Sequence, residues 1–309
     1  MHTAKRGLVA LFGMVASATL TVSPFGATIR DDVPDSAYLA LGALADFTPV
    51  GVFVNSWGYT GCGILIAPDW VLTAAHMLDA ATSGTFTING TAYTSSSIFR
   101  DPGWTGNVFA GNDFGLMHLG TPVTNVTPAA LYTGTLDGQI ATYVGYGFTG
   151  TGLTGWRTLD NQRRAFQNVI DGNFNVPALL FGSDFDNPHA TNDSSWGSVL
   201  PLLLEGCVAP GDSGGGVFVT NGSQYVLAGV ISFVAATDGN ANADYGDFSG
   251  ADSIASALPW INSIVPEPSI SALALGGGFM ALGFRRLNKR RRLTPETASV
   301  QTLRGGRTL

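Results

Sequence analysis

The chain has 309 residues, of which 45% are hydrophobic and only 12% are charged, and it contains 41 glycines. This composition supplies ample apolar surface for a buried core and argues against a disordered chain. Between residues 28 and 266, five arginines stand against 20 acidic residues, a net charge of −15, so nucleic acid and anionic membranes are poor partners for this part of the chain.

The first 27 residues predict a secretory signal peptide. Lys5 and Arg6 precede an apolar run from Gly7 to Val22, and small residues follow as far as Ala27. The run is short for a bilayer span, and the order of basic, apolar and small residues is typical of exported proteins. We expect cleavage between residues 23 and 28.

The body of the chain, residues 28–264, predicts an all-β fold. Short segments rich in Val, Ile, Thr, Phe and Tyr alternate with Gly, Asn, Asp and Pro, and no long stretch has helical periodicity. In the segment ILIAPDWVLTAAHML, two apolar strands joined by a Pro-Asp turn lead directly into His76. Histidine is the side chain best suited to take up a proton near neutral pH.

Two later segments supply a carboxylate and a hydroxyl. In the segment NDFGLMHL, Asp113 precedes a short apolar strand, and His118 in that strand is expected on the flank of the barrel. In the segment APGDSGGG, Ser213 lies in a glycine-rich turn. A serine becomes a nucleophile only beside a base, and the base needs a third group to orient it. The turn also fits the G-x-S-x-G elbow of α/β-hydrolases, but that fold needs a histidine after the serine and none follows Ser213.

The segments WVLTAAH and GDSGG, with the order His76, Asp113, Ser213, resemble the trypsin-like serine proteases of the chymotrypsin fold. The resemblance covers about residues 45–264. It implies two six-stranded antiparallel β-barrels, at about 45–135 and 136–250, and a short closing helix at 252–264. Within it, GYGFTG at residues 145–150 is similar to the start of the second barrel in this family.

The same resemblance implies a serine endopeptidase acting on protein or peptide substrates. His76, Asp113 and Ser213 would form the catalytic triad, and the amides of Gly211 and Ser213 the oxyanion hole. The family positions for substrate binding are Cys207, Ser232, Phe233 and Val234. With Cys207 at the pocket base and Val234 narrowing it, the resemblance implies a preference for small apolar side chains. A catalytically silent relative that only binds, or a matrix protein sorted by its tail, remains the alternative.

The chain departs from the family in two ways. Met77 stands where a cysteine of the usual histidine-loop disulfide would be, and whether Cys62 and Cys207 pair is open. The Ile-Val-Gly-Gly sequence, whose new N-terminus pairs with the aspartate before the serine in activated trypsins, is missing. In this chain that aspartate is Asp212, and the sequence does not identify its partner.

A loop rich in oxygen ligands raises the question of calcium. Its alternate positions carry Asp238, Asn240, Asn242 and Asp244. Ala243 stands where an EF-hand needs glycine and Ser249 where it needs a bidentate glutamate, so a solvated loop is the simpler interpretation. We expect no metal or other cofactor.

The C-terminal stretch VPEPSISALALGGGFMALGFRRLNKRRR, residues 265–292, predicts a sorting signal. A Pro-Glu-Pro motif is followed by mostly apolar residues 270–284, expected as an apolar helix, and then by a basic cluster. It resembles the PEP-CTERM signal of Gram-negative bacteria, which implies an exosortase-type processing enzyme, transient membrane association through residues 270–284, and a secreted or cell-surface product. A tail, residues 293–309, follows the signal.

Overall fold

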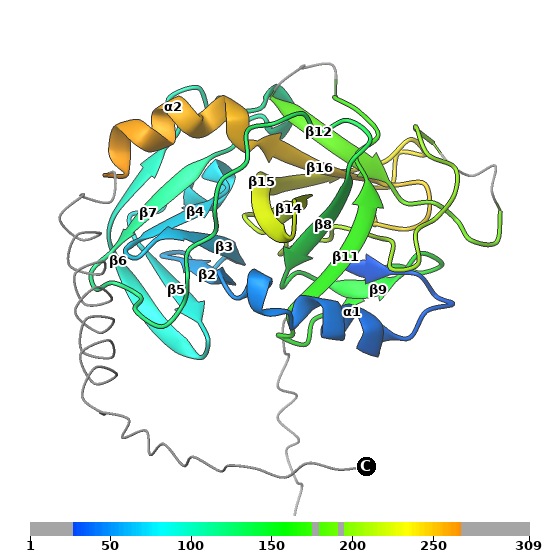
Figure 1. Cartoon of the computed structure of the whole chain (residues 1–309), viewed down its shortest axis with the longest axis horizontal. Helices are drawn as coiled ribbons and strands as arrows, with labels where there is room; N and C mark the ends of the chain where they lie inside the picture. The colour runs from blue at the N-terminus through cyan, green and yellow to red at the C-terminus, as the bar shows by residue number, and fades with distance from the viewer. Residues whose placement is uncertain (1–26, 175–178, 191–194, 267–309) are drawn as a thin grey trace, which may run out of the picture. The chain divides into compact units, whose positions relative to one another are not determined.

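Six antiparallel strands close into a barrel in the first half of the body (Figure 1). The computed structural model describes residues 27–174, 179–190 and 195–266. The barrel order is β2-β3-β4-β7-β6-β5. Its strands are β2 (Val50–Asn55), β3 (Thr60–Ala67), β4 (Trp70–Thr73), β5 (Gly84–Ile88), β6 (Thr91–Arg100) and β7 (Gly115–Leu119). The first predicted barrel is therefore confirmed.

The sequence of the barrel explains its closure. In β5 the burial alternates with a period of two, so Phe86 and Ile88 face the core while Thr85 and Thr87 are partly exposed. Asn89 and Gly90 join β5 to β6 with φ of 47° and 76°, the left-handed pair that a two-residue hairpin turn requires. Phe53 of β2 is also fully buried inside the barrel.

A second six-stranded antiparallel sheet follows, in the order β11-β8-β14-β15-β16-β12. Its strands are β8 (Ile140–Gly145), β11 (Arg164–Val169), β12 (Leu180–Asp184), β14 (Gly216–Asn221), β15 (Gln224–Ala235) and β16 (Phe248–Ser253). Its core includes stacked rings of Tyr143 and Phe166, with centroids 4.8 Å apart.

The expectation of a second closed barrel is corrected to a half-barrel. β11 and β12 are the edge strands, and within the described residues a single bridge between Gly172 and Gly182 links the chain after β11 to β12. One bridge is too little pairing to continue the ladder around the circle, so the sheet is six-stranded but open.

Several elements were not expected from the sequence. A small sheet has the order β10-β9-β1-β13, formed by β10 (Gly155–Thr158), β9 (Thr149–Thr151), β1 (Thr28–Ile29) and β13 (Gly206–Cys207). Helix α1 (Asp35–Gly42) packs beside β11 (Figure 1), where the buried Arg164 guanidinium binds Asp35 of the helix at 2.6 Å and Asp160 at 2.7 Å. Three short 3₁₀ helices are η1 (Ala45–Phe47), η2 (Ala75–Leu78) and η3 (Val108–Ala110).

The closing helix is present as α2 (Ile254–Ile264). It starts two residues later than expected because Asp252 and Ser253 still pair with neighbouring strands in β16. The chain divides at Ile261 into two units, and the second is described only from Asn262 to Pro266. The predicted leader up to residue 26 and the predicted apolar segment 270–284 lie outside the described residues. Within the described ranges, no helix is long and apolar enough to cross a membrane.

Candidate active site

His76 and Asp113 lie at the adjoining ends of the paired barrel strands β4 and β7. His76 lies in η2 directly after β4, where the small, fully buried Ala74 and Ala75 let the chain turn close to the barrel. Its Nδ1 lies 2.6 Å from Asp113 Oδ2, and its backbone N–H donates to Asp113 Oδ1 at 2.8 Å. Two bonds to one carboxylate fix both the backbone and the ring of the histidine.

Asp113 is completely buried and bonded on every side. It precedes β7, and its Oδ2 also accepts a hydrogen bond from Ser232 Oγ at 2.5 Å. Its own amide donates to Asp252 Oδ1 at 3.1 Å. Burial, and next the charge of Asp113, raise the pKa of Asp252 well above its ordinary value. Sequence reasoning missed Asp252, which is 139 residues away along the chain.

The other histidines of the described chain lie elsewhere. His118 of β7 contacts Ser96 Oγ at 2.7 Å and Asp69 at 3.2 Å on the flank of the barrel, as expected. His189 is half-exposed and contacts Asp31 at 3.1 Å. Among the described histidines, His76 alone contacts a buried carboxylate.

The turn around Ser213 needs its glycines. Gly211 and Gly214 have φ of 90° and 81°, and a Cβ on Gly214 would lie 2.2 Å from the carbonyl oxygen of Cys62. The turn is fixed from both sheets: Cys62 N donates to Ser213 O at 2.7 Å, and Gly214 N donates to Ile231 O at 2.9 Å. Ser213 itself is half-buried.

Two amides of this turn remain available. The hydrogen bonds found in the described residues use the amides of Asp212, Gly214 and Gly215 but not those of Gly211 and Ser213. Within the same residues, no hydrogen bond joins Ser213 Oγ to His76. Free amides at a turn of this kind are suited to bind an oxyanion.

A cavity of about 270 Å³ opens beside Ser213. It lies between the 208–210 segment and β15, and most of the residues that line it are apolar: Val208, Ala209, Pro210, Ser213, Ile231, Ser232, Phe233 and Val234. The predicted substrate-binding residues Ser232, Phe233 and Val234 belong to this lining, although the Ser232 hydroxyl is bonded to Asp113. Cys207 does not line the cavity and is fully buried behind it, with Ser249 Oγ 3.5 Å from its sulfur.

Both cysteines are free and buried. Cys62 Sγ accepts from the amide of Tyr146 at 3.2 Å and contacts the carbonyl of Gly211 at 3.3 Å, so its position is set by the turns on either side of it. Burial raises the pKa of both thiols. The two cysteines therefore pack in the interior as free thiols and form no disulfide with each other.

Within the described residues, three backbone amides donate to the Asp212 carboxylate and no side-chain cation forms an ion pair with it. Its Oδ1 accepts from Gly147 N at 2.7 Å, and its Oδ2 from Ala209 N at 2.9 Å and from Ala27 N at 3.1 Å. Burial raises the pKa of Asp212 to about 7. A Cβ on Gly145 would lie 2.1 Å from Oδ1, so the Gly-Tyr-Gly sequence is needed here to make room for the carboxylate.

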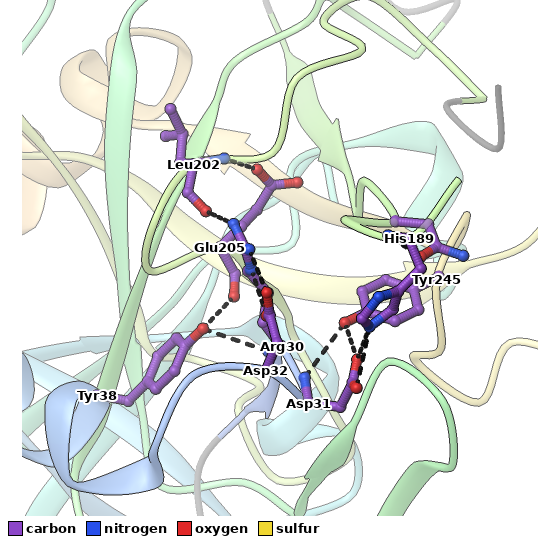
Figure 2. Close-up of polar contacts among 9 residues, drawn as sticks. Arg30, Asp31, Asp32, Tyr38, His189, Leu202, Glu205 and Tyr245 are labelled. Atoms are coloured by element: carbon purple, nitrogen blue, oxygen red, sulfur yellow. Dashed lines mark hydrogen bonds and ion pairs between the residues drawn. The ribbon is translucent and has the colours of Figure 1, made fainter. Parts of the chain in front are cut away.

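The N-terminal strap, which we define as residues 27–32, is anchored in the small sheet through β1 and to nearby loops; Figure 2 shows the polar contacts of its residues 30–32. Thr28 pairs with Cys207 in β13, and its hydroxyl donates to Ala243 O at 2.7 Å. Arg30 Nη1 donates to Leu202 O at 2.7 Å, and Asp31 accepts from Tyr245 Oη at 2.6 Å. Because these contacts fix the residues that follow Ala27, they help to hold its amide beside Asp212.

The loop beneath the strap is supported by Glu205. Its buried carboxylate accepts from the amides of Asp186, at 2.7 Å, and Leu202, and burial raises the pKa of Glu205 to about 8. Its backbone carbonyl accepts from Tyr38 Oη at 2.9 Å (Figure 2). The strap and this loop thus share one network of polar contacts.

The oxygen-rich loop forms bonds within itself. Asp238 Oδ1 accepts from Asn240 N at 2.7 Å, and Asn242 Oδ1 from Asp244 N at 3.2 Å. Across the part of the chain that the structure describes, no group of three or more His, Cys, Asp or Glu side chains is arranged to hold a metal. Calcium binding stays a hypothesis.

Comparison with known proteins places the chain in a family. The model of the trypsin-like peptidase domain matches residues 61–228. Chymotrypsin-like elastase family member 1 of Canis lupus familiaris is 27% identical over 232 residues, covering 68% of this chain and 83% of the dog protein. The proteins of the same name from Felis catus and Rattus norvegicus are 28% identical over 239 residues and 26% over 234, each covering 68% of this chain and 80% of the relative. The chain belongs to the trypsin-like peptidase family.

Proposed function

We propose that the chain is a secreted serine endopeptidase that cuts peptide bonds through an acyl-enzyme. The observation that carries the proposal is the contact between His76 and the buried Asp113, beside a turn that leaves the amides of Gly211 and Ser213 free. A catalytically silent relative would have no need for a histidine held by two bonds to one carboxylate. A matrix protein sorted by its tail would need neither feature.

The roles follow from this geometry. Ser213 Oγ attacks the scissile carbonyl carbon while His76 Nε2 takes the hydroxyl proton, because Nδ1 is committed to Asp113. The amides of Gly211 and Ser213 stabilise the negative oxygen that forms. His76 then gives its proton to the leaving nitrogen, the C–N bond breaks, and a water molecule activated by His76 hydrolyses the Ser213 ester.

The cavity supports a preference for apolar side chains of modest size on the acyl side of the cut bond. Its walls carry no charged residue, and Val234 of β15 is one of the residues that line it. The relatives named elastases are consistent with this preference. No carboxylate lines the cavity to attract Lys or Arg.

Maturation between Gly26 and Ala27 would complete the site. Ala27 has a φ of 65°, and in an intact chain this left-handed conformation costs a residue with a side chain about 1–2 kcal/mol. At a free N-terminus no residue precedes Ala27, so this cost disappears. Cleavage there converts the Ala27 amide, 3.1 Å from Asp212, into an ammonium group. An ammonium group would hold the Asp212 carboxylate in its charged form. The new N-terminus at Ala27 would then replace the Ile-Val-Gly-Gly N-terminus that this chain lacks.

Export and C-terminal processing belong to the same proposal. The leader and the PEP-CTERM-like stretch 265–292 support export from a Gram-negative cell and removal of residues from about Pro266 onward by an exosortase-type enzyme. Mass spectrometry of protein from the native host tests this. A full-length chain that keeps Arg285 to Arg292 in the membrane fraction would replace the sorting signal by a permanent anchor.

A fluorophosphonate probe tests the catalytic proposal directly. The secreted chain should be labelled on Ser213, and Ser213→Ala should abolish both labelling and peptide hydrolysis, a loss of about 10⁶ in rate. Ser223→Ala, at an exposed turn, is the matched control and should leave both unchanged. Absence of labelling in a folded, mature chain would favour the catalytically silent alternative.

A further inference from the structure

A second cavity, of about 770 Å³, lies between helix α1, the first barrel and the segment that leads into β11. Its walls come from the end of α1, from β2, from the β5–β6 turn, from Tyr146 and from residues 161–163. None of these residues lines the cavity beside Ser213, so the two cavities are separate. Cavities of about 300–1,000 Å³ are typical of sites for small molecules and short peptides.

The charge of this cavity is unlike that of the rest of the body. Arg163 is the only charged residue in its walls. Within the described residues Arg30, Arg100 and Arg164 form ion pairs with aspartates, but no ion pair joins Arg163 to a carboxylate. Residues 28–266 contain 20 acidic residues and five arginines, yet no acidic residue lines this cavity. The cavity is therefore positively charged in a strongly acidic chain.

Backbone carbonyls hold the guanidinium at the cavity wall. Arg163 Nε donates to Gly42 O at 2.7 Å, at the end of α1, and Nη1 lies 3.4 Å from Val50 O. Burial raises the pKa of Tyr146, and the charge of Arg163 opposes that rise, so the Tyr146 hydroxyl lies near the guanidinium. A guanidinium has more N–H donors than these neighbours use, and the remaining ones can serve a ligand.

The walls around Arg163 are fixed by contacts of their own. The amide of Tyr146 donates to Cys62 Sγ at 3.2 Å, and Asn89 lies in the hairpin turn with a φ of 47°. Helix α1 is held to β11 by the bond between Arg164 and Asp35 at 2.6 Å. A site whose walls are already ordered loses little conformational freedom when a ligand binds.

The composition of the walls indicates the class of ligand. A guanidinium binds a carboxylate through two parallel hydrogen bonds, whereas phosphate groups are usually bound by clusters of basic residues. One arginine therefore matches a group with a single negative charge. Leu39 and Val52 add apolar surface, and both are partly exposed. The ligand that fits both parts of the wall has a carboxylate at one end and an apolar body.

We propose that this cavity binds an organic carboxylate with an apolar body. The carboxylate accepts hydrogen bonds from Arg163, and the apolar body lies against Leu39 and Val52. The C-terminal end of a peptide and a fatty acid both have this chemistry. The site is separate from the proposed peptidase site and does not depend on its activity.

Titration calorimetry tests the proposal in the Ser213→Ala chain, in which the proposed nucleophile cannot react with a ligand. The probes are acetyl-Leu-Leu and octanoate, each compared with its neutral amide. Each carboxylate that binds should do so at least about tenfold more tightly than its amide, because hydrogen bonds to a charged group are stronger. The tighter of the two carboxylates identifies the source as a peptide end or a fatty acid.

Substitutions locate the binding. Arg163→Gln should lower the affinity for the carboxylate about tenfold and change that for the amide less than about twofold. Asn89→Asp adds a negative charge with almost no change in shape, at a φ that Asp tolerates, and should lower carboxylate affinity about fivefold. Arg157→Gln, at an exposed arginine outside the cavity, is the matched control and should have no effect.

The Asn89→Asp variant decides the question if Arg163→Gln does not fold, because it keeps the bond from Arg163 to α1. Equal affinities for carboxylates and amides would overturn the proposal, as would no binding of either carboxylate at millimolar concentration. A folded Arg163→Gln chain with a lower Tm and an unchanged preference for carboxylates would also overturn it. That result would show that Arg163 only caps the end of α1.

Discussion

At the scale of single residues, two neighbouring buried acidic residues have different roles. The Asp113 carboxylate accepts hydrogen bonds from His76 and Ser232. The Asp252 carboxylate accepts a hydrogen bond from the backbone amide of Asp113, and burial and the charge of Asp113 raise the pKa of Asp252. Two adjacent buried carboxyls cannot both carry a charge cheaply. The raised pKa of Asp252 favours its neutral form, which lessens the charge repulsion that Asp113, the group that orients the histidine, meets from it.

Substitution by asparagine should separate the two carboxyls. Asn is close in shape to a protonated Asp, so Asp252→Asn should keep kcat/KM within about threefold of the wild type, while Asp113→Asn should lose about 10⁴, as in other serine protease triads. The measurement is anilide hydrolysis near neutral pH, with thermal unfolding to verify folding. A loss in Asp252→Asn as large as in Asp113→Asn would show that Asp252 carries the charge.

Val234 should control the size of the side chain accepted before the cut bond. Val234→Gly enlarges the cavity beside Ser213, so the ratio of kcat/KM for phenylalanine over alanine should rise about tenfold or more. Thr220→Gly, at an exposed position of β14, controls for the cost of a glycine in a strand, about 1 kcal/mol. Profiling on a peptide library that instead finds cleavage after Lys or Arg would mean that this cavity does not receive the acyl side.

At the scale of elements, local patterns could be predicted and long-range ones could not. The β5–β6 hairpin is readable from Asn89-Gly90, and the His76 and Ser213 turns from neighbouring small residues, because the physical cause lies within a few positions. β1 has only two residues, and its partners Cys207 and Gly150 lie far along the chain. The bond between Ala27 N and Asp212 likewise spans 185 residues, so no local pattern could indicate it.

The strap makes a prediction about the mature N-terminus. A chain that begins at Ala27 should hydrolyse the anilide at least about 100-fold faster than one that begins at Gly26, because only the first places a charged amine beside the buried carboxylate of Asp212. Both chains can be made with a removable N-terminal tag and tested for rate and for probe labelling.

A double-mutant cycle provides the control for the strap. Asp212→Asn should reduce the activity of the chain starting at Ala27 but have much less additional effect in the chain starting at Gly26. Equal activity of the two wild-type chains would refute the maturation site, while leaving the triad assignment intact.

At the scale of the whole molecule, acidic groups dominate the charge and several are buried. Burial raises the pKa of Glu205 to about 8 and the pKa values of Asp171 and Asp247 to about 6. The net charge of residues 28–266 is −15, so self-repulsion also grows as these groups ionise. Both effects make the folded chain less stable as these carboxyl groups ionise.

Thermal stability should consequently fall as the pH rises from about 5 to about 9. Groups whose pKa is higher in the folded state than in the unfolded chain contribute stability that is complete below the unfolded value, near 4, and is lost as the pH passes through about 6 and then about 8. Thermal unfolding followed across this range in about 0.1 M and about 1 M salt separates the two causes, since salt screens surface repulsion but hardly affects buried carboxyls. A decline that persists in high salt is expected. A Tm that is constant or rises up to pH 9 would show that Glu205, Asp171 and Asp247 ionise without cost, and that the amides around them compensate fully for their burial.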